Sequence, residues 1–153
     1  MLMSSVSLEN SVSRRLRPKV VLDTNILISA LALISESSDQ VIELARRGEI
    51  ELYISKPILF EFLRVLMEKF RYNENEANER LALILKIAML VDPKEKFSAI
   101  EDDESDNRIL ECAFAAKTNF IVSGDKHLKS LKEFKSIRIL SPSEFIRDYF
   151  SDR

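Results

Sequence analysis

A short apolar strand that ends in an aspartate constrains this chain more than any other feature. Residues 19–25 read Lys-Val-Val-Leu-Asp-Thr-Asn, so an apolar run rich in valine stops at a carboxylate, a hydroxyl and an amide. In a chain that alternates helices and strands, such a run is typical of a buried parallel strand. Ligands of open α/β sheets bind at the carboxyl ends of the strands. Asp23 is therefore expected at the rim of a sheet, with its carboxylate facing a crevice.

A second stretch repeats this design much later in the chain. Residues 119–125 read Asn-Phe-Ile-Val-Ser-Gly-Asp, again an apolar run that closes on a carboxylate. The carboxyl ends of parallel strands meet at one edge of a sheet. We interpret the two stretches as neighbouring strands that bring Asp23 and Asp125 to one site.

The remaining pattern alternates helices and strands. Further strands are predicted over residues 50–54, 89–91 and 136–140, and helices over 57–70, 73–88, 106–117 and after the capping sequence 141–144. This alternation predicts an α/β fold, a three-layer α/β/α sandwich with a central, mainly parallel sheet of about five strands. Residues 19–150 are expected to form a single domain, and residues 1–18 a flexible N-terminal extension.

Composition excludes several classes of protein. The chain of 153 residues is 46% hydrophobic and 31% charged, which is ordinary for a soluble globular protein. No apolar run approaches the roughly 18 residues of a membrane span, and no signal-peptide pattern is present. The single cysteine, Cys112, excludes an internal disulfide or a cysteine-based zinc site; we expect a buried structural thiol and a cytoplasmic protein. With only two glycines, Gly48 and Gly124, the chain has no phosphate-binding glycine loop.

The charges are segregated although the net charge is only −2. Residues 101–106 contain five acids, whereas basic residues recur after Asp125. These basic residues are Lys126, Lys129, Lys132, Lys135 and Arg138. The two segments are either solvated faces, or a carboxylate cluster that binds metal beside a basic strip that holds phosphates.

Four acids are candidates for catalysis: Asp23, Glu61, Asp106 and Asp125. Each has a structural alternative, since Asp106 could be an N-cap, Glu61 could lie on the rim of its helix, and Asp125 could be a turn residue. A charge that closes a buried strand, as Asp23 does, needs a partner. Carboxylate oxygens suit Mg²⁺ or Mn²⁺, which can activate water for phosphodiester cleavage. The lone His127 is interpreted as a surface residue, because a metal-activated water requires no histidine base.

Taken in order, these motifs resemble the pattern of PIN domains, from residue 19 to about residue 150. The chain is most similar to the branch of toxin–antitoxin toxins related to the VapC-type ribonucleases. The resemblance implies that Asp23, Glu61, Asp106 and Asp125 bind Mg²⁺ or Mn²⁺ and cleave single-stranded RNA. It also implies polar supports at Asn25 and Ser123. Of Asp102 and Asp103, one could add a ligand or orient waters, with Asp103 the named candidate, or both could be solvated.

The resemblance further suggests an antitoxin partner and a homodimer, and no membrane association is expected. Two other functions are alternatives to this one. A phosphatase of the haloacid dehalogenase type would need a second acid two residues after Asp23, where this chain has Asn25. A non-catalytic PIN-like module that binds RNA or protein would be expected to lack some of the four acids, all of which are present.

Overall fold

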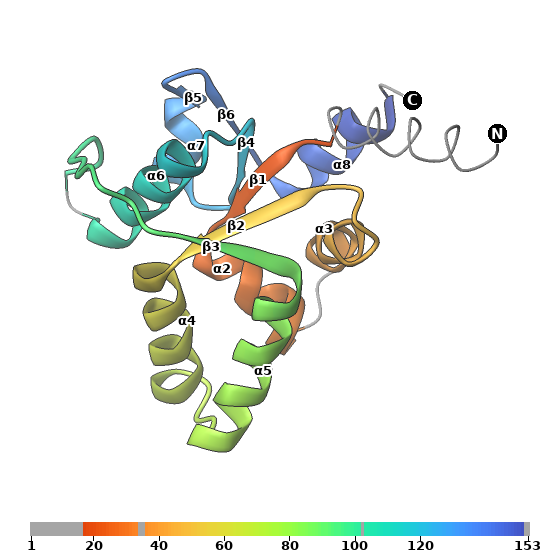
Figure 1. The fold of residues 1–153 in the computed structure, drawn as a ribbon, viewed down its shortest axis with the longest axis vertical. Helices are drawn as coiled ribbons and strands as arrows, with labels where there is room; N and C mark the ends of the chain where they lie inside the picture. Colours follow the sequence, from red (N-terminus) through yellow and green to blue (C-terminus); the bar gives the residue numbers. More distant parts are fainter. Residues whose placement is uncertain (1–16, 34–35, 102, 152–153) are drawn as a thin grey trace, which may run out of the picture.

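The computed structural model describes residues 17–33, 36–101 and 103–151. A six-stranded sheet of order β3-β2-β1-β4-β6-β5 runs through the centre of this part of the chain (Figure 1). Its strands are β1 (Lys19–Leu22), β2 (Glu51–Ser55), β3 (Ala88–Val91), β4 (Phe120–Val122), β5 (Glu133–Phe134) and β6 (Ile137–Leu140). Neighbouring strands are parallel except for β5 against β6. The predicted fold class is confirmed, with the two-residue β5 as an addition.

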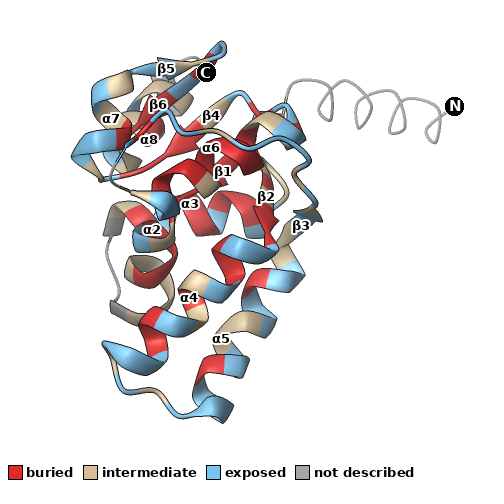
Figure 2. Ribbon diagram, turned by 90° about the vertical axis from the view of Figure 1, so that its left-hand side faces the viewer, coloured by how far each residue is buried: buried red, intermediate tan, exposed pale blue. Residues whose placement is uncertain are grey.

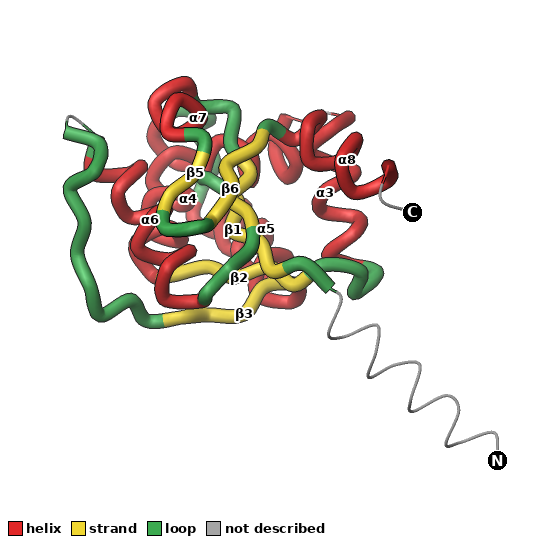
Figure 3. Tube along the Cα trace, turned by 90° about the horizontal axis from the view of Figure 1, so that it is seen from above, coloured by secondary structure: helices red, strands yellow, loops and turns green. Residues whose placement is uncertain are grey.

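Helices cover both faces of the sheet. They are α2 (Thr24–Ile28), the π-helical turn η1 (Ser29–Leu33), α3 (Glu36–Arg46), α4 (Lys56–Glu68), α5 (Glu74–Ile87), α6 (Glu104–Ala116), α7 (Lys126–Leu131) and α8 (Pro142–Ser151). Figure 3 shows α3 and α8 on one side of the strands and α4 and α6 on the other. The result is the predicted three-layer arrangement.

The central strands β1 and β4 are buried on consecutive residues after their half-buried first residue, rather than on alternate residues. Val20 and Val21 of β1 and Ile121 and Val122 of β4 have no exposed surface. A parallel strand covered on both faces needs apolar side chains at every position, which is why these runs contain no alternating polar residues. Figure 2 shows the buried residues gathered around the strands, with exposed residues on the outer turns of α4 and α5.

The register between β1 and β4 places the two strand ends side by side. Leu22 pairs with Val122, and the amide of Asp23 donates to the carbonyl of Val122 over 3.1 Å. Asp23 and Ser123, the next residues on each strand, therefore leave the sheet at the same edge. The β1–β4 pairing fixes this edge as the location of the site.

Two predicted helix starts are confirmed by their caps. Asn73 and Glu76 form a capping box at the start of α5, each side chain bonding the other residue's amide. Ser141 and Glu144 make the same reciprocal bonds, of 3.1 and 2.8 Å, at the start of α8. Both sequences follow the Ser/Asn-x-x-Glu pattern that satisfies otherwise unpaired amides at a helix start.

The predicted start of α6 was wrong by one half-turn. The helix begins at Glu104 rather than at Asp106, because the carboxylate of Asp103 accepts the amide hydrogen of Asp106 over 3.1 Å and acts as the N-cap. Asp106 consequently lies inside the first turn. The structural alternative of Asp106 as a plain N-cap is therefore excluded.

The predicted N-terminal extension lies almost entirely outside the described residues. Of its last two residues, Arg17 binds Glu51 over 2.9 Å and the carbonyl of Gly48 over 3.0 Å. Pro18 accepts a hydrogen bond from the amide of Glu51. These contacts join the start of the described chain to β2.

Within the described ranges, no helix is long and apolar enough to cross a membrane.

Candidate active site

Three aspartates at the carboxyl edge of the sheet each cap a helix. One oxygen of Asp23 accepts the amide of Ile26 over 2.9 Å at the start of α2, and one oxygen of Asp103 caps α6. Asp125 accepts the amides of His127 and Leu128, over 2.8 and 3.1 Å, at the start of α7. A capping carboxylate is held by one of its oxygens. In Asp103 and Asp125 the second oxygen is left for other contacts.

Asp106 completes a group of three carboxylates. Oxygen atoms of Asp103, Asp106 and Asp125 all lie within 4.8 Å of one another. Asp106 is only 6% exposed, and its Oδ2 atom is buried without a hydrogen-bond donor among the described residues. A buried acceptor without a donor is costly, and a cation bound at this atom would relieve that cost.

Ser123 connects Asp23 to this group. Its hydroxyl donates to Oδ2 of Asp23, and Oγ of Ser123 in turn accepts the amide hydrogen of Asp125 over 2.9 Å. Ser123 is fully buried and Asp23 is 3% exposed. Both oxygens of Asp23 have hydrogen-bond donors, the amide of Ile26 and the hydroxyl of Ser123, and Asp23 is not a member of the three-carboxylate group.

Burial and mutual repulsion raise the pKa values of Asp23 and Asp106. The pKa of Asp106 rises from 3.8 to about 8, first because burial disfavours the charged form, and then because of Asp125, Asp103 and Asp23 around it. Burial also raises the pKa of Asp23 to about 6, against the opposing hydrogen bonds from Ser123 and the amide of Ile26. Without a cation the group therefore retains a proton near neutral pH.

Asn107 holds the loop that precedes the site, a role that the sequence analysis missed. Its side chain accepts the amide of Ile100 over 3.0 Å and donates to the carbonyl of the same residue over 2.6 Å. Asn107 is 4% exposed, as is fitting for an amide side chain with both groups bonded. The position of Asn107 next to a predicted ligand was the available signal.

Glu61 lies in a pocket adjacent to the carboxylates rather than among them. Its two oxygens bind the guanidinium of Arg64 over 2.7 and 3.1 Å. The pocket has a volume of about 190 Å³ and is lined by Thr24, Pro57, Ile58, Glu61, Glu104, Ser105 and Arg108. Thr24 and Glu104 adjoin Asp23 and Asp103 in the chain, so this pocket borders the acid group.

The other candidates are placed as follows. Asn25 is exposed on α2, and His127 is exposed on α7. Cys112 is fully buried, and burial raises the pKa of its thiol to about 12, which fits a structural residue and not a nucleophile. Asp102 lies outside the described residues.

The donor set fits a divalent cation with hard-ligand preferences. Carboxylate oxygens from Asp103, Asp106 and Asp125 converge, one of them is buried without a donor, and the repulsion among them would be relieved by positive charge. Mg²⁺ and Mn²⁺ favour this oxygen chemistry. These residues could hold such an ion.

A parallel α/β sheet with aspartates gathered at its carboxyl edge defines the class of protein, and sequence comparison gives the family. A sequence profile described as PIN domain matches residues 19–127, so the chain belongs to the PIN domain family. A relative from Methanocaldococcus jannaschii, described as uncharacterized protein MJ1680, is 29% identical over 147 residues, which span 88% of this chain and 94% of the relative.

Three solved structures share the fold. VapBC2 of Rickettsia felis, bound to a DNA fragment from its promoter, matches with a TM-score of 0.57 and 18% identity over 79% of this chain and 96% of that one. VapC20 of Mycobacterium tuberculosis, a toxin that cleaves the sarcin-ricin loop, matches with a TM-score of 0.54 and 14% identity over 78% of this chain and 98% of that one. The PIN domain of T. brucei RRP44 matches with a TM-score of 0.52 and 13% identity over 90% of this chain and 83% of that one.

The raised pKa of Asp106 predicts that the metal-free protein loses stability as pH rises. The folded protein keeps this proton up to about pH 8, whereas an unfolded aspartate loses it near 3.8, so the folded state binds more protons in between. Melting temperatures in EDTA should fall between about pH 4 and pH 8, and Asp106→Asn should flatten this slope. Asp39→Asn, on α3, is the matched control. An unchanged slope in Asp106→Asn would contradict the assignment.

The two hydrogen bonds between Asn107 and Ile100 predict that replacing Asn107 lowers both the stability of the fold and the affinity for an ion. Asn107→Ala leaves a buried amide and carbonyl unpaired and should lower the free energy of unfolding by about 1–3 kcal/mol. It should also weaken Mn²⁺ binding, because the loop that delivers Asp103 loses its anchor. Urea denaturation and Mn²⁺ titration measure the two effects. Asn119→Ala removes an exposed bond to the amide of Lys19 instead, and should leave Mn²⁺ affinity unchanged. Equal Mn²⁺ affinity in Asn107→Ala and the wild type would refute this role.

Proposed function

We propose that this protein is a divalent-metal-dependent endoribonuclease that cleaves phosphodiester bonds in single-stranded RNA. The observation that carries the proposal is the group of Asp103, Asp106 and Asp125, with a buried oxygen of Asp106 that has no donor among the described residues. Membership of the PIN domain family supports it. The fold shared with VapC20, a toxin that cleaves RNA at the sarcin-ricin loop, gives further support.

We assign Asp106 and Asp125 as ligands of Mg²⁺ or Mn²⁺, with Asp103 as the third member of the group. A bound ion of this kind supplies a Lewis acid that lowers the pKa of an attacking water and stabilises charge on the phosphate oxygens. Asp23 is a further acid of the proposal, outside the three-carboxylate group and held by Ser123. Glu61 is the fourth catalytic acid of the proposal, positioned from α4 through the adjoining pocket, and Asn25 is a polar support on α2.

In this proposal the carboxylates are held in position before a ligand binds. The caps on α6 and α7 fix Asp103 and Asp125 as a consequence of folding. Carboxylates held in place need no reorganisation when an ion or a phosphate approaches, and this is the condition under which electrostatic stabilisation is most effective. The proton retained by Asp106 would be released on ion binding, since positive charge favours the ionised carboxylate.

The biological setting proposed is the toxin of a toxin–antitoxin pair, with an antitoxin protein as partner. The support is the fold shared with VapBC2 and with VapC20, which is described as a toxin. The alternative is a non-catalytic PIN-like module that binds RNA or protein. The acid group at the sheet edge favours the catalytic proposal, because a module that only binds would have no need of clustered, mutually repelling carboxylates.

The first experiment pairs RNA cleavage with thermal melting. The wild type should cut single-stranded RNA only with Mg²⁺ or Mn²⁺, and Mn²⁺ should raise its melting temperature because the ion binds the folded state. Asp125→Asn and Asp23→Asn should retain the fold and lose roughly a hundredfold or more of the cleavage rate, equivalent to several kcal/mol of charge stabilisation. Asp23→Asn should also raise the metal-free melting temperature by removing repulsion. Wild-type rates in either variant would disprove this account.

Glu61 has a matched control on its own helix. Glu68 also binds Arg64, over 2.8 Å, but is exposed and does not line the pocket. Glu61→Gln and Glu68→Gln each remove one carboxylate partner of the same arginine, so a lower cleavage rate in Glu61→Gln alone would come from the pocket. Equal rates in the two variants would remove Glu61 from the site.

We also propose a homodimer formed through exposed apolar side chains on α4, α5 and β3. These side chains are Phe60, Met67, Leu83, Leu85, Met89 and Leu90, exposed by between 39% and 66%. β3 is an edge strand, and an apolar edge strand is a ready surface for association.

Light scattering should therefore give the mass of a dimer. Met89→Lys combined with Leu90→Lys should shift the protein to the monomer without lowering its melting temperature, because both side chains already face water. A monomeric mass for the wild type at high concentration would count against the dimer.

A further inference from the structure

The basic residues that follow Asp125 surround one edge of the sheet. This basic strip consists of Lys126, Lys129, Lys132, Lys135 and Arg138. It spans α7, edge strand β5 and the start of β6, and Glu133 is its only acidic residue. The acid group and the basic strip are therefore contiguous, and the capping residue Asp125 joins them.

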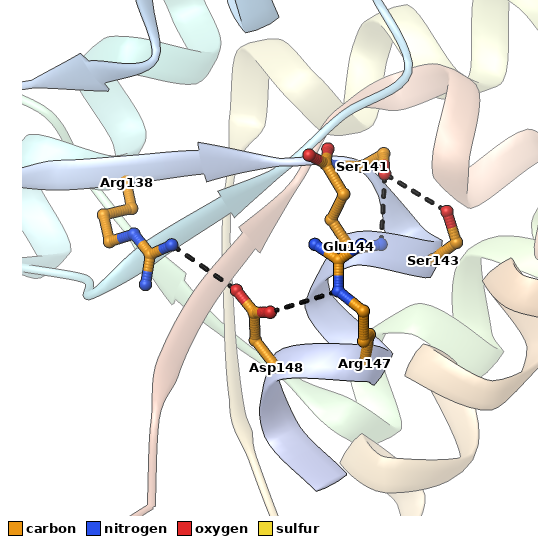
Figure 4. A network of polar contacts seen from close by, with 6 residues as sticks. All are labelled: Arg138, Ser141, Ser143, Glu144, Arg147 and Asp148. Atoms are coloured by element: carbon orange, nitrogen blue, oxygen red, sulfur yellow. Dashed lines mark hydrogen bonds and ion pairs between the residues drawn. The ribbon is translucent and has the colours of Figure 1, made fainter. Parts of the chain in front are cut away.

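Two members of the strip are turned toward α8 and paired there. Lys129 lies 3.4 Å from Glu144, and Arg138 lies 3.4 Å from Asp148. Figure 4 shows Arg138 reaching from its strand toward Asp148 on the helix. These pairs join α7 and β6 to α8, so their charges are already compensated within the protein.

The other three lysines are exposed and uncompensated. Lys126, Lys132 and Lys135 have no carboxylate partner within the part of the chain that the structure describes. The ammonium of Lys135 lies instead over the rings of Phe97, Phe114 and Phe134, at 5.5 to 5.7 Å from their centroids. Aromatic rings hold a cation in place without neutralising its charge.

The backbone at two of these lysines is unusual. Lys132 has φ 61° and Lys135 has φ 48°, and Ser136 follows with φ 71°. Positive φ is disfavoured for residues with a side chain, by roughly 1–2 kcal/mol, and glycine or asparagine is the usual choice in such turns. Strained positions of this kind are common at functional sites, although Arg71 and Lys117 also have positive φ in this protein. Glycine at either position would relieve the strain and lose a lysine.

The three free lysines lead away from the acid group along the edge of the sheet. Lys126 follows Asp125 directly, and the carbonyl of Lys132 accepts the amide of Ile139 near the carboxyl end of β6. Lys135 lies in the turn at the opposite end of β6, a strand of four residues or about 13 Å. A line of positive charge therefore runs from the proposed catalytic site along the length of β6.

A site lined by carboxylates repels the phosphates that it must cleave. The net charge of −2 gives no general attraction to RNA, so attraction has to come from a localised patch. Lys126, Lys132 and Lys135 provide one on the side where α7 leaves the site.

We propose that Lys126, Lys132 and Lys135 form a track that binds the phosphates of single-stranded RNA flanking the bond to be cleaved. This proposal rests on the ribonuclease function proposed above and assigns its substrate-binding surface. The contacts are to phosphates, so the track binds without regard to base sequence. Lys129 and Arg138 position the track through α8 and contribute less to binding.

The experiment measures RNA affinity against salt. Fluorescence anisotropy with a labelled single-stranded RNA, in EDTA to prevent cleavage, is recorded for the wild type and for Lys126→Gln/Lys132→Gln/Lys135→Gln. Each phosphate contact on a single strand contributes about 0.7 to the slope of log affinity against log salt, so the triple variant should lose a slope of about 2 and bind roughly tenfold or more weakly. The corresponding triple arginine variant keeps the charge and should retain binding.

The matched control removes three lysines elsewhere. Lys69→Gln/Lys86→Gln/Lys94→Gln has the same loss of charge, from the ends of α4 and α5 and the loop beyond β3, and should retain the wild-type slope. Circular dichroism confirms that all variants are folded. If both glutamine triples lower affinity equally while the wild type binds and cleaves RNA, the track is refuted and the ribonuclease stands. If the wild type neither binds nor cleaves RNA, both proposals fall.

Discussion

Aspartates that start helices also form the site, and much of this structure depends on that double use. An aspartate at an N-cap satisfies amides that would otherwise be unpaired, and the positive end of the helix stabilises its charge. In this protein three such caps, Asp23, Asp103 and Asp125, come together because their strands and helices meet at one edge of the sheet. Each cap alone is favourable for folding. Their convergence produces a concentration of negative charge that folding alone would not favour.

Asp106 is where this conflict is greatest. It is buried, lies beside two other carboxylates, and has an oxygen without a donor among the described residues. Its pKa is raised to about 8, so the metal-free protein reduces the repulsion by keeping a proton. A cation would reduce the repulsion in another way, by supplying positive charge. The same residue therefore couples the stability of the protein to pH, and would couple it to ion binding.

The parts of the fold that could be predicted are those where burial decides the sequence. β1 and β4 are covered on both faces, so their apolar runs predicted strands and the polar residues predicted the strand ends. The caps of α5 and α8 were also predicted from the sequence. The short elements were not. α7 has six residues and β5 has two, lengths at which local propensity is weak and tertiary contacts decide the structure.

The site was predictable in its residue types but not in its geometry. Asp23, Asp106 and Asp125 come to one edge as expected, but five acids in residues 101–106 did not reveal which one caps α6. Asp103 caps α6, and the side chain of Asn107 binds Ile100 across the preceding loop, and neither contact leaves a periodic signal in the sequence. The arginine that holds Glu61 was visible three residues away, but the pocket that Glu61 shares with α6 depends on how two helices pack.

The loop between β3 and α6 connects the acid group to the basic strip. It is held at Ile100 by Asn107, and at the amide of Phe97 by Glu111 over 2.8 Å. The ring of Phe97 packs edge-on against Phe114 and Phe134, and these three rings hold the ammonium of Lys135. Asn107, Glu111 and Phe114 all belong to α6, so a single helix positions the Asp103 carboxylate at one end and the farthest lysine of the track at the other. A rigid helix keeps both ends at a fixed separation, and the proposed cleavage at a set distance from track-bound phosphates would depend on that separation.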